Sequence, residues 1–199
     1  MNNQLQELLA ELEQFGSGND SATTERSRKM LNITRDTGEF LAVLVRAIVA
    51  RRVLEIGTSN GYSTLWLASA AQAIGGSVTT VEFSDYKIAL ATKTFARSGL
   101  ASFIASIQDD AGRVLERTAD SAFDFIFLDS ERPEYPGWWA NLGFALAVCS
   151  SWTTLLLTRR KWHRSSLSSK PIRSSRPVSF AWAMASSWRS KQACDGWKN

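Results

Sequence analysis

Three acidic side chains lie at or near the carboxyl ends of predicted strands. These are Glu55, Glu82 and Asp129. The carboxyl ends of strands in an open parallel sheet meet at one edge, and ligands bind there. Glu82 also follows Gly61 by 21 residues, about where an acid accepts hydrogen bonds from ribose hydroxyls. The acids therefore predict a ligand site at this edge of a sheet.

The turn at residues 57–61, Gly-Thr-Ser-Asn-Gly, follows the first of these strands directly. Its two glycines allow the backbone to pass close to a ligand at the start of the next helix. The spacing is G-x-x-x-G rather than the G-x-G-x-x-G that a pyrophosphate needs. A nucleoside without phosphates has no such requirement, and Glu55 would repel a phosphate and attract a cation. The alternative is that the glycines only form a tight turn.

The same five residues also match G-x-S-x-G, the nucleophile elbow of hydrolases, with Ser59 in the nucleophile position. The predicted strand before the turn and the predicted helix after it fit that context. A serine nucleophile needs a general base, however, and the one histidine, His163, lies in a C-terminal segment of unusual composition. A serine hydrolase is therefore a further alternative for this turn.

Short apolar segments alternate with helical segments and would position these residues. We predict strands at residues 52–56, 77–82, 103–107 and 123–129. We predict helices at residues 4–15, 38–50, 62–73, 85–100 and 111–120, and a polar loop at 16–24. This alternation is typical of an α/β fold with a Rossmann-like, doubly wound, mainly parallel sheet, here with an N-terminal helical extension.

The charge of the 199-residue chain is divided unevenly. The net charge of +4 alone would suggest a nucleic acid or an anionic surface as partner. Residues 1–149, however, hold 13 Lys/Arg and 18 Asp/Glu, or −5, whereas residues 150–199 hold 10 Lys/Arg and one acid, or +9. The acidic part argues against nucleic acid, and no apolar run is long enough for a membrane span. Two cysteines and the absence of a leader peptide predict a cytoplasmic location.

Four motifs occur in an order that resembles a known enzyme family. They are VLEIGTSNGYSTLWLA at 53–68, TTVEFSDYKIALATKTFARSGL at 79–100, QDDAGRVL at 108–115 and FDFIFLDSERPEYPGWW at 123–139. Together they look like the class I S-adenosylmethionine-dependent O-methyltransferases. The similar branch is the bacterial one related to catechol and caffeoyl-CoA O-methyltransferases. The resemblance covers about residues 28–148.

The resemblance implies S-adenosylmethionine as cofactor, a small-molecule hydroxyl as methyl acceptor, and a homodimer formed through the N-terminal helices. The implied cofactor-binding positions are Glu55, Gly57, Thr58, Ser59, Gly61, Ser63, Glu82, Phe83, Asp110 and Ala111. Within this set, Glu55 and the two glycines would line the methionine end. Glu82 would bind the ribose hydroxyls, and Asp110 with Ala111 would border the adenine. A positive sulfonium would suit a pocket with carboxylate walls.

Asp129 corresponds by the same resemblance to the family's first metal-ligand position and is the candidate catalytic residue. A divalent cation such as Mg²⁺ would there lower the pKa of the acceptor hydroxyl and orient it for methyl transfer. The alternative is an acid at a strand end that caps the next helix. The partner ligands expected in the family are not found in the sequence that follows.

The C-terminal segment departs from the family. We expect a cofactor-binding domain at residues 1–148 and a basic tail rich in Ser, Arg and Trp at 149–199. The single codons of Trp and Met force glycines when Trp182 to Ala185 are read in a shifted frame. Suitable codons extend that reading to GNGEFLAVK, which resembles the family's closing strand. In the same frame, residues 153–158 can become D-V-V-V-D, which recovers a second metal aspartate. The tail is therefore hypothesised to arise from a frameshift near residue 147.

The tail bears on fold and activity whatever its origin. Residues 153–157, TTLLL, could fill the slot of the fifth strand, whereas 165–177 cannot supply the alternation of a sixth, so the sheet edge is expected to be aberrant. An incomplete metal site would leave a catalytically impaired cofactor-binding remnant, which is one functional alternative. A real basic tail with RNA-binding character is another.

The frameshift hypothesis predicts an insertion or deletion in the coding DNA near codon 147. Resequencing that DNA, together with the same locus in related strains, checks this. An intact frame without an indel in all of them would contradict the hypothesis and establish the tail as genuine.

Overall fold

The computed structural model describes residues 2–119, 121–130, 146–149 and 154–157, all within one compact unit, Met1–Arg160. A six-stranded sheet runs through this unit in the order β3-β2-β1-β4-β5-β6. Its strands are β1 (Arg52–Ile56), β2 (Ser77–Glu82), β3 (Ile104–Gln108), β4 (Phe125–Leu128), β5 (Leu146–Cys149) and β6 (Thr154–Leu157). The pairings from β3 to β5 are parallel and β6 is antiparallel. The predicted α/β fold with a mainly parallel, doubly wound sheet is confirmed.

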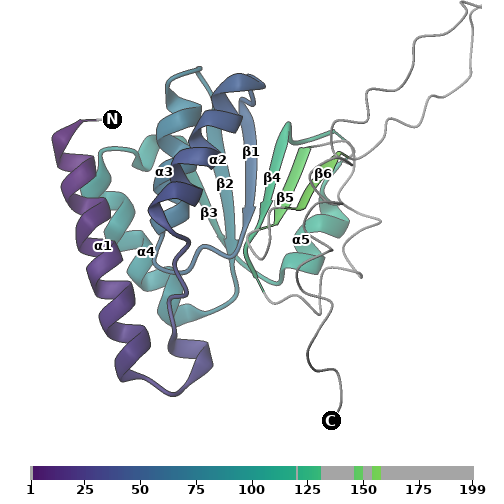
Figure 1. The fold of residues 1–199 in the computed structure, drawn as a ribbon. Helices are drawn as coiled ribbons and strands as arrows, with labels where there is room; N and C mark the ends of the chain where they lie inside the picture. Colours follow the sequence, from purple (N-terminus) through teal and green to yellow (C-terminus); the bar gives the residue numbers. More distant parts are fainter. Residues whose placement is uncertain (1, 120, 131–145, 150–153, 158–199) are drawn as a thin grey trace, which may run out of the picture. The chain divides into compact units, whose positions relative to one another are not determined.

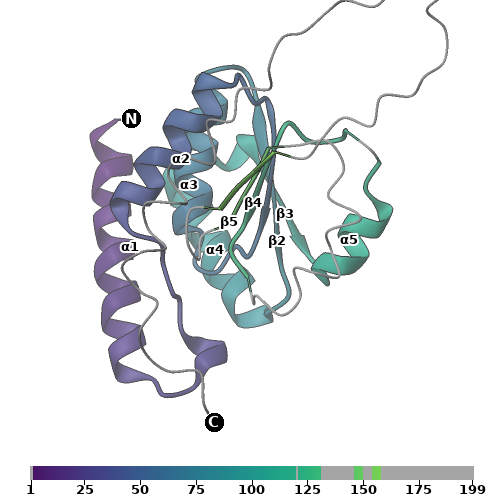
Figure 2. The ribbon, with the colours of Figure 1, turned by 45° about the vertical axis from the view of Figure 1, so that its right-hand side comes forward.

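The centre of the sheet is buried on both faces because helices cover both. Every residue of β4, and every residue of β1 except Arg52, is buried. Alternate side chains enter two apolar clusters. One contains Val53 and Phe125 and the other contains Leu54 and Ile126. Figure 2 shows α1 to α4 on one face of the sheet and α5 on the other. This layering accounts for the nearly continuous apolar runs in the central strands.

Helices alternate with strands from β1 to β4, and two further helices precede β1 (Figure 1). The helices are α1 (Asn3–Ala22), α2 (Arg35–Ala47), α3 (Tyr62–Gln72), α4 (Asp85–Ser98) and α5 (Ala111–Arg117), with 3-10 turns η1 (Arg26–Arg28) and η2 (Ala101–Phe103). Side chains of Thr34, Ser84 and Asp110 cap α2, α4 and α5 by accepting a hydrogen bond from the first turn. In the described part of the chain, no helix combines the length and apolarity that a bilayer crossing requires.

The predicted loop at residues 16–24 is wrong over most of its length, because α1 continues through it to Ala22. The glycine at position 16 is needed for close packing rather than for a turn. A Cβ there would lie 2.5 Å from Nδ2 of Asn32, which donates to the Leu12 carbonyl oxygen at 3.0 Å. Contacts with a distant segment therefore stabilise a helix that local composition disfavours.

Two further boundaries differ from the sequence prediction. The helix expected at 38–50 begins earlier, at Arg35, because Thr34 caps it, and it ends at Ala47. The slot beside β4 that TTLLL was expected to fill is occupied by β5, whereas Thr154–Leu157 pairs with β5 as the antiparallel edge strand. The described part of the sheet thus continues to Leu157.

The ends of β1 and β4 approach each other so closely that only glycine fits at position 57. Gly57 has φ +103°, and a Cβ there would lie 2.2 Å from the Asp129 carbonyl oxygen. The amide of Asp129 in turn donates to the Ile56 carbonyl oxygen at 2.8 Å. A side chain at position 57 would therefore push the two strand ends apart.

Gly57→Ala should destabilise the protein by about 3–4 kcal/mol, since it combines a left-handed conformation with a backbone collision. Gly75→Ala is the matched control because Gly75 also has a positive φ, +70°, but has no atom within 4 Å of the added Cβ. We expect the control to cost about 1 kcal/mol. Urea unfolding measures both, and equal losses would contradict the collision.

Candidate functional site

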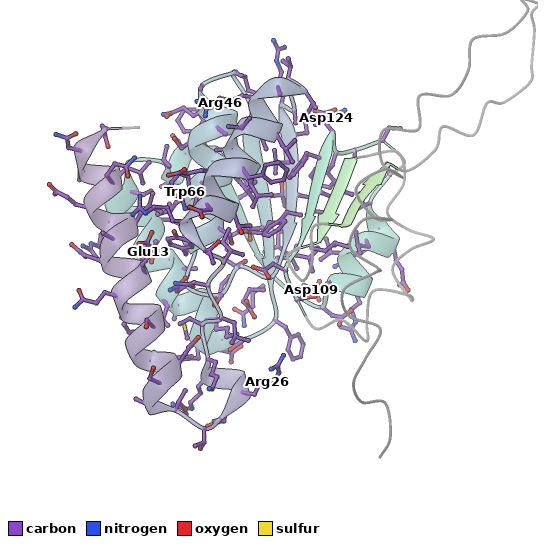
Figure 3. The ribbon with its side chains drawn as sticks, viewed as in Figure 1. Glu13, Arg26, Arg46, Trp66, Asp109 and Asp124 are labelled. Carbon is purple, nitrogen blue, oxygen red and sulfur yellow. The ribbon has the colours of Figure 1, made fainter. Side chains whose placement is uncertain are left out.

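The predicted acids lie at one edge of the sheet because β1 pairs with both β2 and β4. The amide of Gly57 donates to the Val81 carbonyl oxygen at 2.9 Å, next to Glu82 in sequence. The contact of Gly57 with Asp129 brings the end of β4 to the same turn. Figure 3 shows Asp109 toward this end of the sheet and Asp124 at the opposite end. The turn, Glu82 and Asp129 therefore share one edge, as parallel pairing predicts.

The turn between β1 and α3 has an unusual backbone. Gly57, Ser59 and Gly61 have positive φ values of +103°, +51° and +88°. Ser59 is the unfavourable member, since a non-glycine residue in the left-handed region is held there by its surroundings. Its amide donates to Oε2 of Glu82 at 2.9 Å, and its hydroxyl donates to the Met30 carbonyl oxygen at 2.8 Å. Hydrogen bonds to Glu82 and to Met30 therefore hold the turn in this conformation.

The carboxylate of Glu82 is held in place by backbone amides. Besides the amide of Ser59, those of Phe83 and Ser84 donate to Oε1, each at 3.0 Å. The side chain remains partly exposed. An ionised carboxylate can accept at about four lone-pair sites, so acceptor capacity remains for hydroxyls of a ligand. The next residue, Phe83, is 77% exposed.

Glu55 lies beneath the turn with none of its surface exposed. Three hydroxyls donate to its carboxylate: Ser63 and Thr80, each at 2.6 Å, and Thr64. The hydroxyls of Thr58 and Thr80 also lie 2.6 Å apart. Predicted cofactor residues Glu55, Thr58 and Ser63 thus belong to a buried polar network that joins β1 and β2 to the start of α3.

Burial raises the pKa of Glu55 to about 7, and the nearby charge of Asp129 contributes in the same direction. The hydroxyls of Ser63, Thr64 and Thr80 oppose this increase, because they stabilise the ionised form. The result is a buried carboxylate that titrates near neutral pH.

The residues predicted to border the adenine lie where β3 passes into α5. Asp110 caps this helix by accepting from the amide of Arg113 at 3.0 Å, and Ala111 is its first residue. The amide of Asp109 donates to the Glu82 carbonyl oxygen at 3.2 Å. A hydrogen bond from Arg117 lowers the pKa of Asp109. The end of β3 is thereby joined to the end of β2.

The chain matches the O-methyltransferase family over residues 3–147. It belongs to that family. A curated relative is the catechol O-methyltransferase of Mycobacterium tuberculosis, 37% identical over 100 residues, which are 50% of this chain and 45% of that protein. The catechol O-methyltransferase of Niastella koreensis is 30% identical over 118 residues, 58% of this chain and 53% of that protein. The chain thus spans about half the length of these relatives.

The solved structures of O-methyltransferases include similar folds. That of the Bacillus cereus enzyme, in complex with SAH, has a TM-score of 0.57 and 28% identity, and the match covers 74% of this chain and 66% of that one. The comparisons do not favour the serine hydrolase or the impaired remnant. The hydroxyl of Ser59 is also engaged with Met30, and His163 lies outside the described residues.

A segment that the sequence analysis missed borders the site. Met30 is 2% exposed, and its carbonyl oxygen accepts from Ser59. The amides of Met30 and Leu31 donate to Asp20 at 2.6 and 2.8 Å. Desolvation would raise the pKa of Asp20, but hydrogen bonds from Asn19, Met30 and Leu31 together lower it. No local pattern indicates these contacts, because Asp20 occurs in a stretch that resembles a polar loop.

Glu55→Gln should change how the stability of the protein depends on pH. Because the folded state retains the Glu55 proton up to about pH 7, against 4.5 for an ordinary glutamate, the wild type should lose stability as the pH rises between these values. The glutamine of the variant stays neutral, so the wild type should lose about 3 kcal/mol relative to the variant over this window. Urea unfolding of both proteins across the window measures it. A constant difference would show that Glu55 does not titrate there.

Proposed function

We propose that the protein transfers a methyl group from S-adenosylmethionine to a hydroxyl oxygen of a small-molecule acceptor. The observation that carries the proposal is Glu82, fixed by three backbone amides at the end of β2 and beside the glycine turn. Family membership and the SAH complex of the Bacillus cereus relative support it. The proposal concerns the activity of the whole protein, whereas the family match covers residues 3–147.

The residues present fit this cofactor. Glu82 would accept hydrogen bonds from the two ribose hydroxyls, and Asp110 with Ala111 would border the adenine. Gly57 and Gly61 leave the backbone of the turn without side chains at the methionine end. Nδ2 of Asn60 in the same turn is buried and has no hydrogen-bond partner among the described residues. The side-chain amide of Asn60 is therefore a donor that a bound cofactor could use.

When bound, S-adenosylmethionine supplies an electrophilic methyl group on a positively charged sulfonium. Glu55 and Asp129 would set the charge of the pocket around it, since carboxylates nearby favour a cation. Glu55 would affect the sulfonium through its charge and not by direct contact, because three hydroxyls enclose its carboxylate. Thr58, Ser59 and Ser63 would hold the turn in shape, and Phe83 offers an exposed apolar ring beside the ribose position.

The described residues do not provide a complete set of ligands for a divalent cation. Asp129 is the proposed ligand, yet no group of three or more His, Cys, Asp or Glu in this part of the chain could hold a metal ion. The second aspartate that the shifted reading recovers would fall within residues 153–158, of which Thr154–Leu157 are described as β6. We therefore derive no step through a metal ion. A homodimer and a cytoplasmic location remain predictions.

Glu82→Gln should weaken binding of S-adenosylhomocysteine by about tenfold to a hundredfold, because charge-assisted hydrogen bonds to the ribose are lost. Isothermal titration calorimetry measures the affinity. Glu116→Gln, a change at an exposed position on α5, is the matched control and should bind like the wild type. Absence of binding by the wild type would refute the proposed cofactor.

Methyl transfer is then tested with a catechol as acceptor, with Mg²⁺ and with EDTA in parallel. Product formed with Mg²⁺ supports the proposed reaction, and its loss with EDTA establishes metal dependence. Binding of S-adenosylhomocysteine without turnover of catechols or other small hydroxyl compounds would reject the enzymatic part of the proposal.

A further inference from the structure

Asp20, in the last turns of α1, binds the backbone of the segment that follows η1. Its Oδ1 accepts from the amide of Met30 at 2.6 Å and its Oδ2 accepts from the amide of Leu31 at 2.8 Å. The ammonium group of Lys29 donates to the Asp20 carbonyl oxygen at 2.9 Å. Both carboxylate oxygens thus fix one short piece of chain, residues 29–31, which we call the strap.

The strap in turn contacts the glycine turn. Ser59 donates its hydroxyl to the Met30 carbonyl oxygen at 2.8 Å, and its amide donates to Glu82 at 2.9 Å. A continuous series of hydrogen bonds therefore runs from Asp20 through Met30 and Ser59 to Glu82. Each step joins residues from a different part of the sequence, so no step follows from local folding.

Backbone strain lies at both ends of the strap–turn contact. Leu31 has φ +51° and Ser59 has φ +51°, although neither is glycine. Such conformations are unfavourable for residues other than glycine and persist only where the surroundings enforce them. The amide of Leu31 is held by Asp20, and that of Ser59 by Glu82. Removing the acceptor at Asp20 frees the strap to relax.

A second contact from α1 reaches the other side of the same turn. Tyr62, which follows Gly61 directly, donates its hydroxyl to Oε1 of Glu13 at 2.6 Å. Nη2 of Arg35 lies 2.9 Å from the same oxygen. Figure 3 shows Glu13 on the side of α1 that faces α2 and α3. Helix α1 is therefore linked to the glycine turn in two ways. The strap connects Asp20 to Ser59 within the turn, and Glu13 binds Tyr62, the residue that follows the turn.

We propose that Asp20 is a positioning residue that, through Met30 and Ser59, holds the glycine turn and Glu82 in the geometry that binds the cofactor. The expected effect of Asp20 on cofactor affinity rests on the proposed function. Its structural part, the coupling of Asp20 to the turn, does not depend on a ligand. Asp20 itself touches neither the turn nor Glu82 in the hydrogen bonds described.

The test compares Asp20→Asn with Glu11→Gln in the full chain. Asparagine keeps one acceptor oxygen but turns an NH₂ group toward the second backbone amide. Glu11 lies on the same helix and pairs with Arg97 of α4 at 2.5 Å, away from the turn. Amide hydrogen exchange should accelerate several-fold at residues 57–61 in the Asp20 variant and remain unchanged in the control. Unchanged exchange at the turn in both would overturn the proposal.

Affinity for S-adenosylhomocysteine gives the second readout. Asp20→Asn should weaken binding by about threefold to tenfold, and Glu11→Gln should not. Ser59→Ala breaks the same series at the step from Met30 to Ser59, so adding Asp20→Asn to it should weaken binding little further. Fully additive losses would show that Asp20 acts by general stability instead. If the wild type does not bind, the proposed function fails, and the exchange of the turn amides still decides the role of Asp20.

Discussion

The approach of the Gly57 backbone to the Asp129 carbonyl oxygen is the constraint on which the site depends. A Cβ at position 57 would lie 2.2 Å from that oxygen, so the end of β4 can lie against the turn only if the turn begins with glycine. The same proximity lets Asp129 influence the buried carboxylate of Glu55. The left-handed backbone that follows then directs the amide of Ser59 to Glu82. The ends of β1, β2 and β4 and the turn after β1 are thereby fixed relative to one another.

The elements nearest the sheet centre were predictable because their burial determines their sequence. The predicted strands 52–56 and 77–82 match β1 and β2 residue for residue, because short runs rich in Val, Ile and Thr between turn residues indicate strands. The glycine turn and the acids at strand ends were also predictable, because parallel pairing brings those ends to one edge. The positions of Glu82 and Asp110 at that edge follow from the same rule.

The parts that sequence reasoning missed depend on contacts between distant residues. The helix α1 continues past residue 16 because Asn32 packs on Gly16, which no local propensity indicates. Asp20 was interpreted as part of a polar loop, although its carboxylate binds Met30 and Leu31. Glu55 is expected to line the methionine end of a pocket, yet the structure buries it completely among the hydroxyls of Ser63, Thr64 and Thr80. A local sequence pattern cannot reveal which residues of another helix or strand a side chain will contact.

The N-terminal position of α1 has a consequence for how the protein folds. Its contacts join residues far apart in sequence: Glu13 to Tyr62, and Glu11 to Arg97, which is 86 residues away. Closing loops of that length is slow relative to forming a helix, so we expect the contacts of α1 to form late in folding. On the ribosome α1 emerges before its partners on α3 and α4. We therefore expect α1 to wait for partners that are synthesised later before it can hold the turn.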